Sequence, residues 1–289
     1  MRIGVTFPQT ELGGDVGAVR AYGEGIAALG FTHVLAYDHV LGADPAAHAP
    51  WAGPYDVTTT FHEPFVMFGF LAAVADVELV TGVIVLPQRQ TALVAKQAAE
   101  VDLLTGGRFR LGVGVGWNHV EYTALGQPFS ERGRRIGEQI GLLRRLWTEQ
   151  SVTHEGTFDR IEAAGLAPLP MQRPIPIWIG GSSEPVYRRI GRLADGWFPQ
   201  VRPGADLDRA LAVIAGAAEA AGRDPAAIGM EGGVRWDGDD AERLARQVER
   251  WRAAGATHLS VDTMRTGRQG VDGHLAALAE VAALVGIHP

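Results

Sequence analysis

Apolar and polar residues follow one another along the chain in an order that repeatedly predicts a strand and then a helix. Short apolar runs rich in β-branched residues precede segments in which apolar residues recur every three or four positions. The first pair is a strand at 2–8 and a helix at 15–29, which Gly30 closes. The remaining strands are predicted at 31–37, 78–86, within 108–121, and at 175–179, 196–199, 228–234 and 257–261, and the remaining helices at 63–75, 91–104, 131–147, 184–193, 207–221, 240–254 and 273–285.

Eight such pairs in 289 residues predict an α/β fold of the (β/α)8 barrel type. A doubly wound open sheet is the competing architecture, but it usually places a nucleotide-binding loop after its first strand. Pro8-Gln9-Thr10 is not such a loop. We therefore expect one barrel domain over residues 1–289. Residues 152–170 break the alternation around a Glu155-Gly156 turn, and we interpret this excursion, near residues 150–172, as an insertion in one loop.

The stretch RFRLGVGVGWNHVE at 108–121 predicts a buried strand that opens into a tight turn. Bulky residues alternate with Arg110 and with glycines at 112, 114 and 116, so one face of this strand has almost no side chains. Glycines inside a strand often mark the close approach of a ligand or of another backbone. A flat ligand over this face and a tightly tapered barrel interior both agree with the pattern.

The composition narrows the class of function. A hydrophobic fraction of 46% and a charged fraction of 20% are typical of a globular enzyme. The net charge of −7 argues against a nucleic-acid partner, and the lack of cysteine excludes disulfides, thiolate metal sites and a cysteine nucleophile. Because no apolar run approaches the ~18 residues of a membrane span and the Met1 end leads directly into a strand, we expect a soluble cytoplasmic protein.

In a barrel, the chemistry lies where strands end and helices begin. At one such junction Gly180-Gly181-Ser182-Ser183 opens a helix, and the outward N–H groups and the helix N-terminus favour an anion. We interpret this segment as a phosphate site, with a simple helix cap as the alternative. At another junction Asp38-His39 begins a long loop that ends near residue 60. His39 either exchanges a proton with a bound ligand or pairs with Asp38 at the surface.

Signatures of other chemistries are missing from the sequence. His48 and His62 lie in the same loop at irregular spacing, so no metal site is predicted. The chain contains neither a GxxxxGK[ST] loop nor a GxSxG nucleophile turn, which disfavours nucleotide triphosphatases and hydrolases. Gly82, late in the third strand, indicates a bulge near a ligand.

Several motifs in order resemble one known family. They are TGVIVLPxR, AKQAAEVDLLTGGRFRLGVGVGW, ERGRRxxExxxLLRxLW, PIPIWIGGSS and ADGWFP. Together they are similar to the luciferase-like monooxygenase superfamily, and most similar to its branch of oxidoreductases that depend on coenzyme F-420, an 8-hydroxy-5-deazaflavin. The resemblance spans about residues 2 to 200, and only HLSVDTM continues it toward the C-terminus.

The resemblance implies a TIM barrel with an inserted region, usually a homodimer, that binds a reduced flavin or deazaflavin across the mouth of the barrel. At the matching positions, Gly82-Val83 would form a non-prolyl cis peptide whose bulge lies against the back of the ring. Asp38 and His39 would lie near the reacting carbon as catalytic residues. The same carry-over assigns cofactor binding to Gly82, Val83, Gly114, Gly116, Asn118, Gly180, Gly181 and Ser182.

One position departs from part of the family. Some deazaflavin dehydrogenases, including those of sugar phosphates, carry a proton-donating glutamate directly after the glycine pair, where this chain has Trp117. The nearest carboxylate is Glu121, one helical turn later, where a surface acid at a helix N-terminus is the simplest interpretation. The departure favours a bulky, apolar substrate, with Trp51, Phe61, Trp117 and Trp236 as pocket walls.

The resulting hypothesis is a deazaflavin-dependent oxidoreductase that moves a hydride between coenzyme F-420 and a small organic substrate, with His39 handling a proton. A monooxygenase that uses reduced FMN and dioxygen is the alternative within the same fold. A non-catalytic flavin-binding protein with the same barrel is the second alternative.

Overall fold

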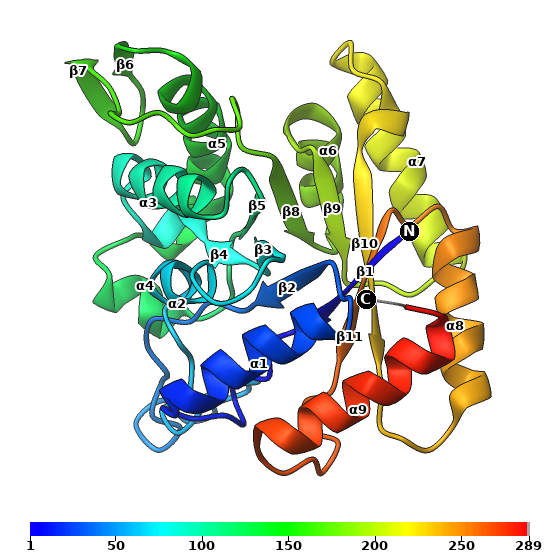
Figure 1. Cartoon of the computed structure of the whole chain (residues 1–289). Coiled ribbons are helices and arrows are strands. Elements are labelled where there is room, and N and C mark those ends of the chain that lie inside the picture. The colour runs from blue at the N-terminus through cyan, green and yellow to red at the C-terminus, as the bar shows by residue number, and fades with distance from the viewer. Residues whose placement is uncertain (288–289) are drawn as a thin grey trace.

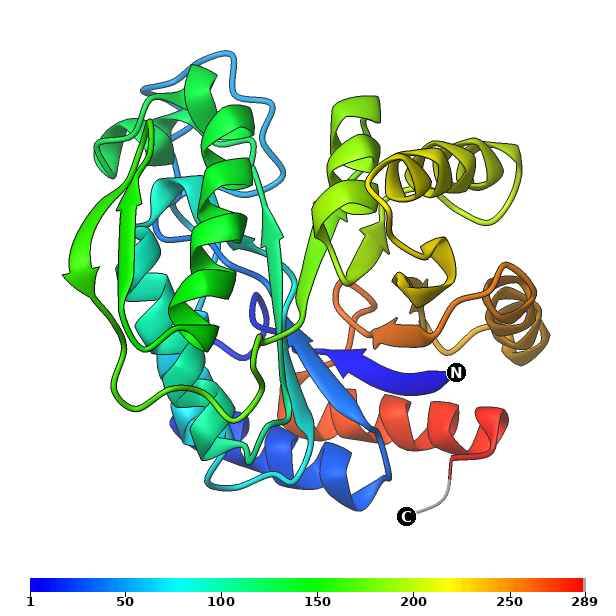
Figure 2. The same cartoon turned by 90° about the horizontal axis from the view of Figure 1, so that it is seen from above.

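The computed structural model describes residues 1–287, and its central feature is a closed barrel of eight parallel strands (Figures 1 and 2). Around the barrel the strands follow the order β3-β2-β1-β11-β10-β9-β8-β5, and pairing between β3 and β5 closes the ring. The predicted (β/α)8 barrel is therefore confirmed. The strands are β1 (Arg2–Thr6), β2 (His33–Ala36), β3 (Glu78–Thr81), β5 (Phe109–Gly114), β8 (Ile177–Gly181), β9 (Gly196–Pro199), β10 (Gly229–Arg235) and β11 (His258–Asp262).

A helix follows each barrel strand and covers its outer face. These helices bury the apolar stripes that their sequences predict; on α5, for example, Ile136, Ile140, Leu143 and Trp147 are fully buried. Asp15 caps α1 by accepting from Gly17 N–H at 2.8 Å. The helices are α1 (Val16–Ala28), α2 (Pro64–Leu71), α3 (Thr91–Leu104), α5 (Arg132–Thr148), α6 (Glu184–Leu193), α7 (Ala205–Ala220), α8 (Ala241–Ala253) and α9 (Gly270–Val285).

Smaller elements were not all predicted. The helix α4 (His119–Ala124) lies in a segment without helical periodicity, and it forms because Asn118 caps it by accepting from Val120 and Glu121 N–H groups. Short 3-10 turns, which also gave no sequence signal, occur at Leu86–Gln88, Phe129–Glu131 and Pro225–Ala227.

The single strand predicted at 78–86 is divided into β3 and a short strand β4 (Ile84–Val85). The Gly82-Val83 peptide between them is cis, as the family resemblance implies. Beyond this bend the chain returns to the barrel, because β4 pairs with the C-terminal half of β5. The interruption therefore pushes residues 82 and 83 out of the line of the strand.

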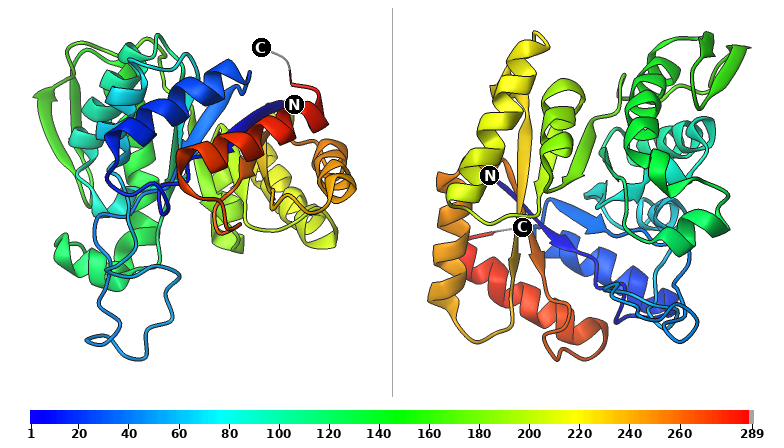
Figure 3. Two further views of the ribbon diagram at one scale, coloured as in Figure 1. Left: turned by 60° about the horizontal axis from the view of Figure 1, so that its bottom comes forward. Right: turned by 180° about the vertical axis from the view of Figure 1, so that it is seen from behind.

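The excursion at 152–170 is a hairpin outside the barrel, as expected for an insertion. Its strands β6 (Val152–Glu155) and β7 (Arg160–Ala164) are antiparallel and pair only with each other. A second excursion, the loop between β2 and α2, extends beyond the barrel in the left view of Figure 3.

A buried charged network fills the barrel near the N-terminal ends of its strands. Arg110 donates to Glu78 Oε1 and to Glu231 Oε2, both at 2.9 Å, and its guanidinium lies 4.4 Å from the centre of the Trp178 ring. His33 contacts Glu231 at 3.0 Å. Although burial opposes ionisation, the pKa of Glu231 is lowered because His33 and Arg110 stabilise its carboxylate. The network gives the barrel a polar floor beneath the mouth.

Replacing Gly112 by alanine tests the packing of the glycine face. Its new Cβ would meet the carbonyl oxygen of Thr81 and the Phe198 ring, so we expect the free energy of unfolding to fall by about 1–3 kcal/mol. Gly216→Ala is the matched control, because that glycine lies within α7 with open space around it, and it should gain up to ~1 kcal/mol. Urea unfolding measures both values. Wild-type stability in Gly112→Ala would contradict the observed packing.

Candidate active site

A cavity of about 580 Å³ opens at the mouth of the barrel, where the strands end. Its size lies in the range of small-molecule and cofactor sites. The cavity brings together most of the residues predicted from sequence, namely Asp38, His39, Gly82, Val83, Gly114, Gly116, Trp117, Gly180, Gly181 and Ser182.

Val83 occupies much of the space that the glycine face leaves. A Cβ on Gly114 would lie 2.6 Å from one Val83 methyl group, and a Cβ on Gly180 would lie 3.1 Å from the other. Gly116, with φ of +63°, faces Val85 in the same way. Gly114 of β5 therefore accommodates Val83 of the neighbouring bend, and Gly116, beyond the end of β5, accommodates Val85 of β4. Val83 and both glycines line the cavity.

Gly180 and Gly181 end β8, and Ser182 and Ser183 join that strand to α6 at one wall of the cavity. Gly181 has φ of +145°, a conformation that side chains disfavour. Ser183 is the N-cap residue of α6, but its hydroxyl makes no capping hydrogen bond. The Ser182 hydroxyl contacts Gln200 at 3.4 Å. The helix N-terminus and these hydroxyl groups thus border the cavity together, which is the arrangement that binds phosphate in other proteins.

His39, which follows β2, forms a pair with Glu121 of α4. His39 Nδ1 lies 3.4 Å from Glu121 Oε2, and the imidazole is surrounded by the rings of Tyr55, Phe61 and Trp117 at centroid distances of 5.3, 4.8 and 5.5 Å. Of the two ring nitrogens, Nδ1 is the one that the carboxylate orients. Nε2 has no hydrogen-bond partner within residues 1–287, and His39 lines the cavity.

The expectation that Glu121 is a surface acid is wrong. Its side chain is 1% exposed, and it accepts from Leu41 N–H at 3.1 Å, from Val40 N–H, and from Gln88 Nε2 at 3.0 Å. Burial alone would raise its pKa, but these donors and His39 outweigh that effect, so the pKa of the Glu121 carboxyl is lowered. Glu121 thus remains charged and holds the first turn of the loop after β2.

Asp38 is engaged in a second buried cluster. It pairs with Arg89 at 2.7 Å and accepts from Val85 N–H at 3.0 Å, and Arg89 also binds Glu63 at 3.0 Å. Burial raises the pKa of Asp38, while Arg89 and the Val85 amide oppose that rise. The carboxylate therefore ties the end of β2 to β4, directly after the bend at residues 82 and 83.

Of the four aromatic residues predicted as pocket walls, one lines the cavity, two pack behind its lining and one lies in the hydrophobic core. Trp117 lines the cavity, Phe61 packs on His39, and Trp51 packs behind Trp117 at 5.6 Å. Trp236 was wrongly predicted as a wall, because it lies in the hydrophobic core with its indole donating to Glu280 of α9 at 2.9 Å. Asn118, predicted to bind the cofactor, is buried and uses its amide to cap α4 and to donate to Leu41 at 3.2 Å.

Sequence reasoning missed other lining residues. Tyr55 lies in the long loop, which carries no periodic pattern, and Ser260 is a small polar residue inside an apolar strand. Phe198 was within reach of prediction, because it belongs to the ADGWFP motif at a strand end. Within residues 1–287, no group of three or more His, Asp or Glu side chains is arranged to hold a metal ion. None of the helices in that range is long and apolar enough to span a membrane.

The barrel and the cavity at its mouth define an enzyme of the luciferase-like type. The chain belongs to the luciferase-like monooxygenase family, whose sequence model matches residues 1–283.

Individual relatives differ in their cofactors. An uncharacterised protein of Mycobacterium bovis is 39% identical over 164 residues, 56% of this chain and 56% of that protein. The F-420-dependent hydroxymycolic acid dehydrogenase of Mycobacterium tuberculosis is 34% identical over 168 residues, 57% of this chain and 46% of that protein. The FMNH(2)-dependent dimethylsulfone monooxygenase of Pseudomonas putida is 40% identical over 111 residues, 37% of this chain and 31% of that protein. The chain thus spans about half the length of these curated relatives, or less.

Solved structures share the fold over nearly the whole chain. The monooxygenase RslO1 from Streptomyces bottropensis superposes with a TM-score of 0.74 at 22% identity, covering 97% of this chain and 98% of its own. An F-420-dependent secondary alcohol dehydrogenase in complex with an F-420-acetone adduct gives a TM-score of 0.76 at 18% identity, covering 98% of both chains. At these identities the likeness concerns the fold alone.

Glu121→Gln tests the buried pair by its pH dependence. Because the folded-state pKa of Glu121 is lowered, its charge stabilises the fold above the ordinary pKa of ~4.3, and this contribution is lost as the pH falls toward the lower folded value. We expect the variant to be less stable by about 1–3 kcal/mol near neutral pH, with the difference shrinking on acidification.

Urea unfolding at a series of pH values measures this difference. Glu100→Gln is the control, since that exposed residue pairs only with Lys96 at 3.9 Å and should change stability by less than ~0.5 kcal/mol. A difference for Glu121→Gln that stays constant or grows on acidification would contradict the assignment.

Proposed function

We propose that this protein is a coenzyme F-420-dependent oxidoreductase that transfers a hydride between the deazaflavin and a small organic substrate. The observation that carries the proposal is the cavity that Val83, the glycine backbone at the end of β5 and His39 line together, with His39 held from behind by the buried Glu121. Membership of the luciferase-like family and the F-420-dependent dehydrogenase relative support the proposal.

The lining of the cavity fits a flat tricyclic ring with a phosphate-bearing side chain. Val83 offers an apolar face for one side of the ring, and the backbone at Gly114 and Gly116 borders the same cavity. The N-terminus of α6 with Gly181 and Ser182 would hold the phosphate. When bound, the deazaflavin supplies the hydride chemistry at its C5 carbon.

His39 is the residue that would manage the proton. Hydride transfer to or from a carbon that carries oxygen requires a proton to move at that oxygen, and an imidazole nitrogen can donate or accept that proton. In our assignment Nε2 faces the substrate, while Glu121 holds Nδ1 and so fixes the orientation of the ring. Asp38 acts as a positioning residue, because Arg89 and Val85 engage both of its oxygens.

A monooxygenase that uses reduced FMN is the second candidate. The relative from Pseudomonas putida, whose name says that it depends on FMNH(2), supports this candidate through its similarity over 111 residues. The phosphate segment at the start of α6 would suit FMN equally well. The two candidate functions therefore differ in which ring lies against Val83 and the glycines, the deazaflavin of coenzyme F-420 or the flavin of FMN.

Titration of the purified protein with oxidised coenzyme F-420 and with FMN separates the candidates. We expect saturable F-420 binding, detected by the change in deazaflavin fluorescence, at concentrations where FMN binds weakly. Tight FMN binding without F-420 binding would overturn the first proposal in favour of the monooxygenase.

Replacement of His39 by alanine tests the proposed proton transfer. Turnover should fall by about 10²–10⁴-fold, the usual contribution of a general acid or base. The Kd for the coenzyme should change by less than about threefold, because the residues proposed to hold ring and phosphate remain. Steady-state kinetics and the fluorescence titration give the two values. Unchanged turnover would remove His39 from the mechanism.

A further inference from the structure

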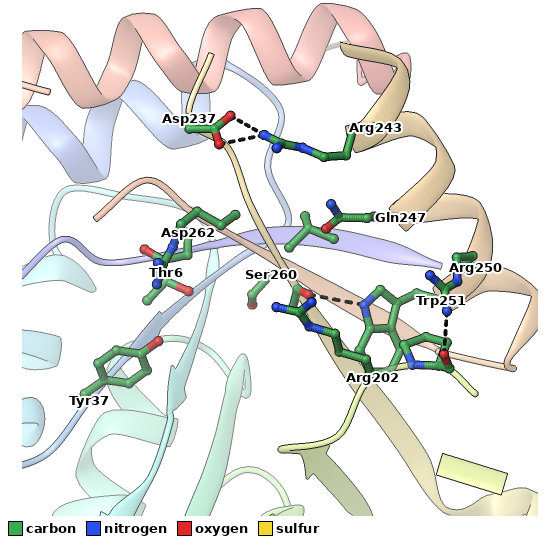
Figure 4. Close-up of a pocket in the computed structure, with 14 residues that line it drawn as sticks. Thr6, Tyr37, Arg202, Asp237, Arg243, Gln247, Arg250, Trp251, Ser260 and Asp262 are labelled. Atoms are coloured by element: carbon green, nitrogen blue, oxygen red, sulfur yellow. Dashed lines mark hydrogen bonds and ion pairs between the residues drawn. The ribbon is translucent and has the colours of Figure 1, made fainter. Parts of the chain in front are cut away.

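A second cavity of about 600 Å³ lies at the mouth of the barrel, on the side of β10, β11 and α8. Figure 4 shows Arg202, Arg243 and Arg250 among its lining side chains, and Arg235 adds a fourth arginine to the lining. Arg202 comes from the segment between β9 and α7, Arg235 ends β10, and Arg243 and Arg250 belong to α8. Four arginines around one cavity stand out in a chain whose net charge is −7.

Two of these arginines are already neutralised. Arg243 binds both carboxylate oxygens of Asp237 at 2.6 Å, and Arg235 lies 3.2 Å from Asp262. The pKa of Asp237 is lowered chiefly by the hydrogen bond from Arg243. Each of these pairs therefore brings no net charge to the cavity.

Arg202 and Arg250 remain without a carboxylate partner among residues 1–287. Arg250 donates through one nitrogen to the carbonyl oxygen of Pro203 at 2.7 Å, which ties α8 to the segment that carries Arg202. Its other guanidinium donors stay free for a ligand. Two uncompensated guanidinium groups with planar, paired donors match a carboxylate or phosphate.

The second cavity adjoins the candidate active site. Thr6, Tyr37, Gly233 and Ser260 line both cavities. A molecule whose charged end lies at the arginines can therefore extend past these residues toward Val83 and His39. Trp251 adds an apolar wall, held by its indole N–H donating to Gly233 at 3.2 Å.

We propose that Arg202 and Arg250 bind an anionic group, a carboxylate or phosphate, of the substrate whose other end reacts in the neighbouring cavity. This inference rests on the proposed oxidoreductase function and specifies its substrate class as organic acids or phosphate esters. The two walls of the combined site, aromatic at Trp117 and cationic at Arg202, select molecules with one apolar and one anionic end.

The test measures binding of simple anions to the coenzyme-loaded full-length protein. The probes are inorganic phosphate and benzoate, with benzamide as the neutral counterpart of benzoate. Loading the coenzyme first occupies the proposed phosphate segment at α6, so that a further anion reports the second cavity. We expect phosphate and benzoate to bind, and benzamide to bind at least about tenfold more weakly than benzoate. The Arg202→Gln and Arg250→Lys variants should each bind the two anions about tenfold more weakly than the wild type, or weaker still.

Arg246→Gln is the matched control. It removes one charge from the same helix α8, but Arg246 pairs with Asp240 and Glu242 on the outer surface and does not line the cavity. Anion affinity should stay within about twofold of the wild type in this variant. Arg202 makes no hydrogen bond within the described chain, so its replacement should leave the fold intact, which circular dichroism checks.

Three results would overturn the proposal. The first is equal affinity for benzoate and benzamide, and the second is unchanged anion binding in Arg202→Gln. The third is a tenfold loss of coenzyme affinity in that variant, which would assign the arginines to the coenzyme's own anionic side chain. If neither coenzyme binds at all, the proposed function fails, whereas benzoate titration of the unloaded wild type and Arg202→Gln still decides the anion site.

Discussion

One side chain, Val83, packs between glycines on two neighbouring strands, and the shape of the active-site cavity depends on this contact. Gly114 of β5 and Gly180 of β8 leave room for its two methyl groups. The bend at residues 82 and 83 can therefore project into the barrel while β4 still pairs with β5. Below the bend, the Arg110 network fills the barrel with polar groups and forms the floor beneath the mouth.

Two buried carboxylates fix the segments around this bend. Asp38 binds the Val85 amide after the bend, and Glu121 binds the amides of Val40 and Leu41 after β2. Since His39 lies between these anchors in sequence and contacts Glu121, the same interactions that hold the backbone also set the position of the imidazole. The geometry of this site thus rests on two carboxylates, Asp38 and Glu121, whose oxygens are engaged by other groups of the protein.

The sequence predicted the architecture well because it depends on local periodicity. The alternation of strands and helices, the glycine face of β5 and the junction at Gly180 follow from residues close together in the chain. The burial of Glu121 could not be predicted in this way, because its partners lie 33 to 82 positions away. The prediction that Trp236 is a pocket wall was wrong for a related reason. The sequence shows that Trp236 follows a strand, but it does not show that its indole packs toward Glu280, 44 positions away.

A crystal structure with coenzyme F-420 bound would show directly whether the cavity at the mouth of the barrel holds the deazaflavin as proposed. We predict that one face of the deazaflavin ring lies in van der Waals contact with Val83, at about 3.5–4.0 Å. The coenzyme phosphate should lie at the backbone of residues 181–183, and His39 Nε2 should lie beside the open side of C5. A ring bound elsewhere, or a coenzyme phosphate held by Arg202 and Arg250, would contradict this prediction.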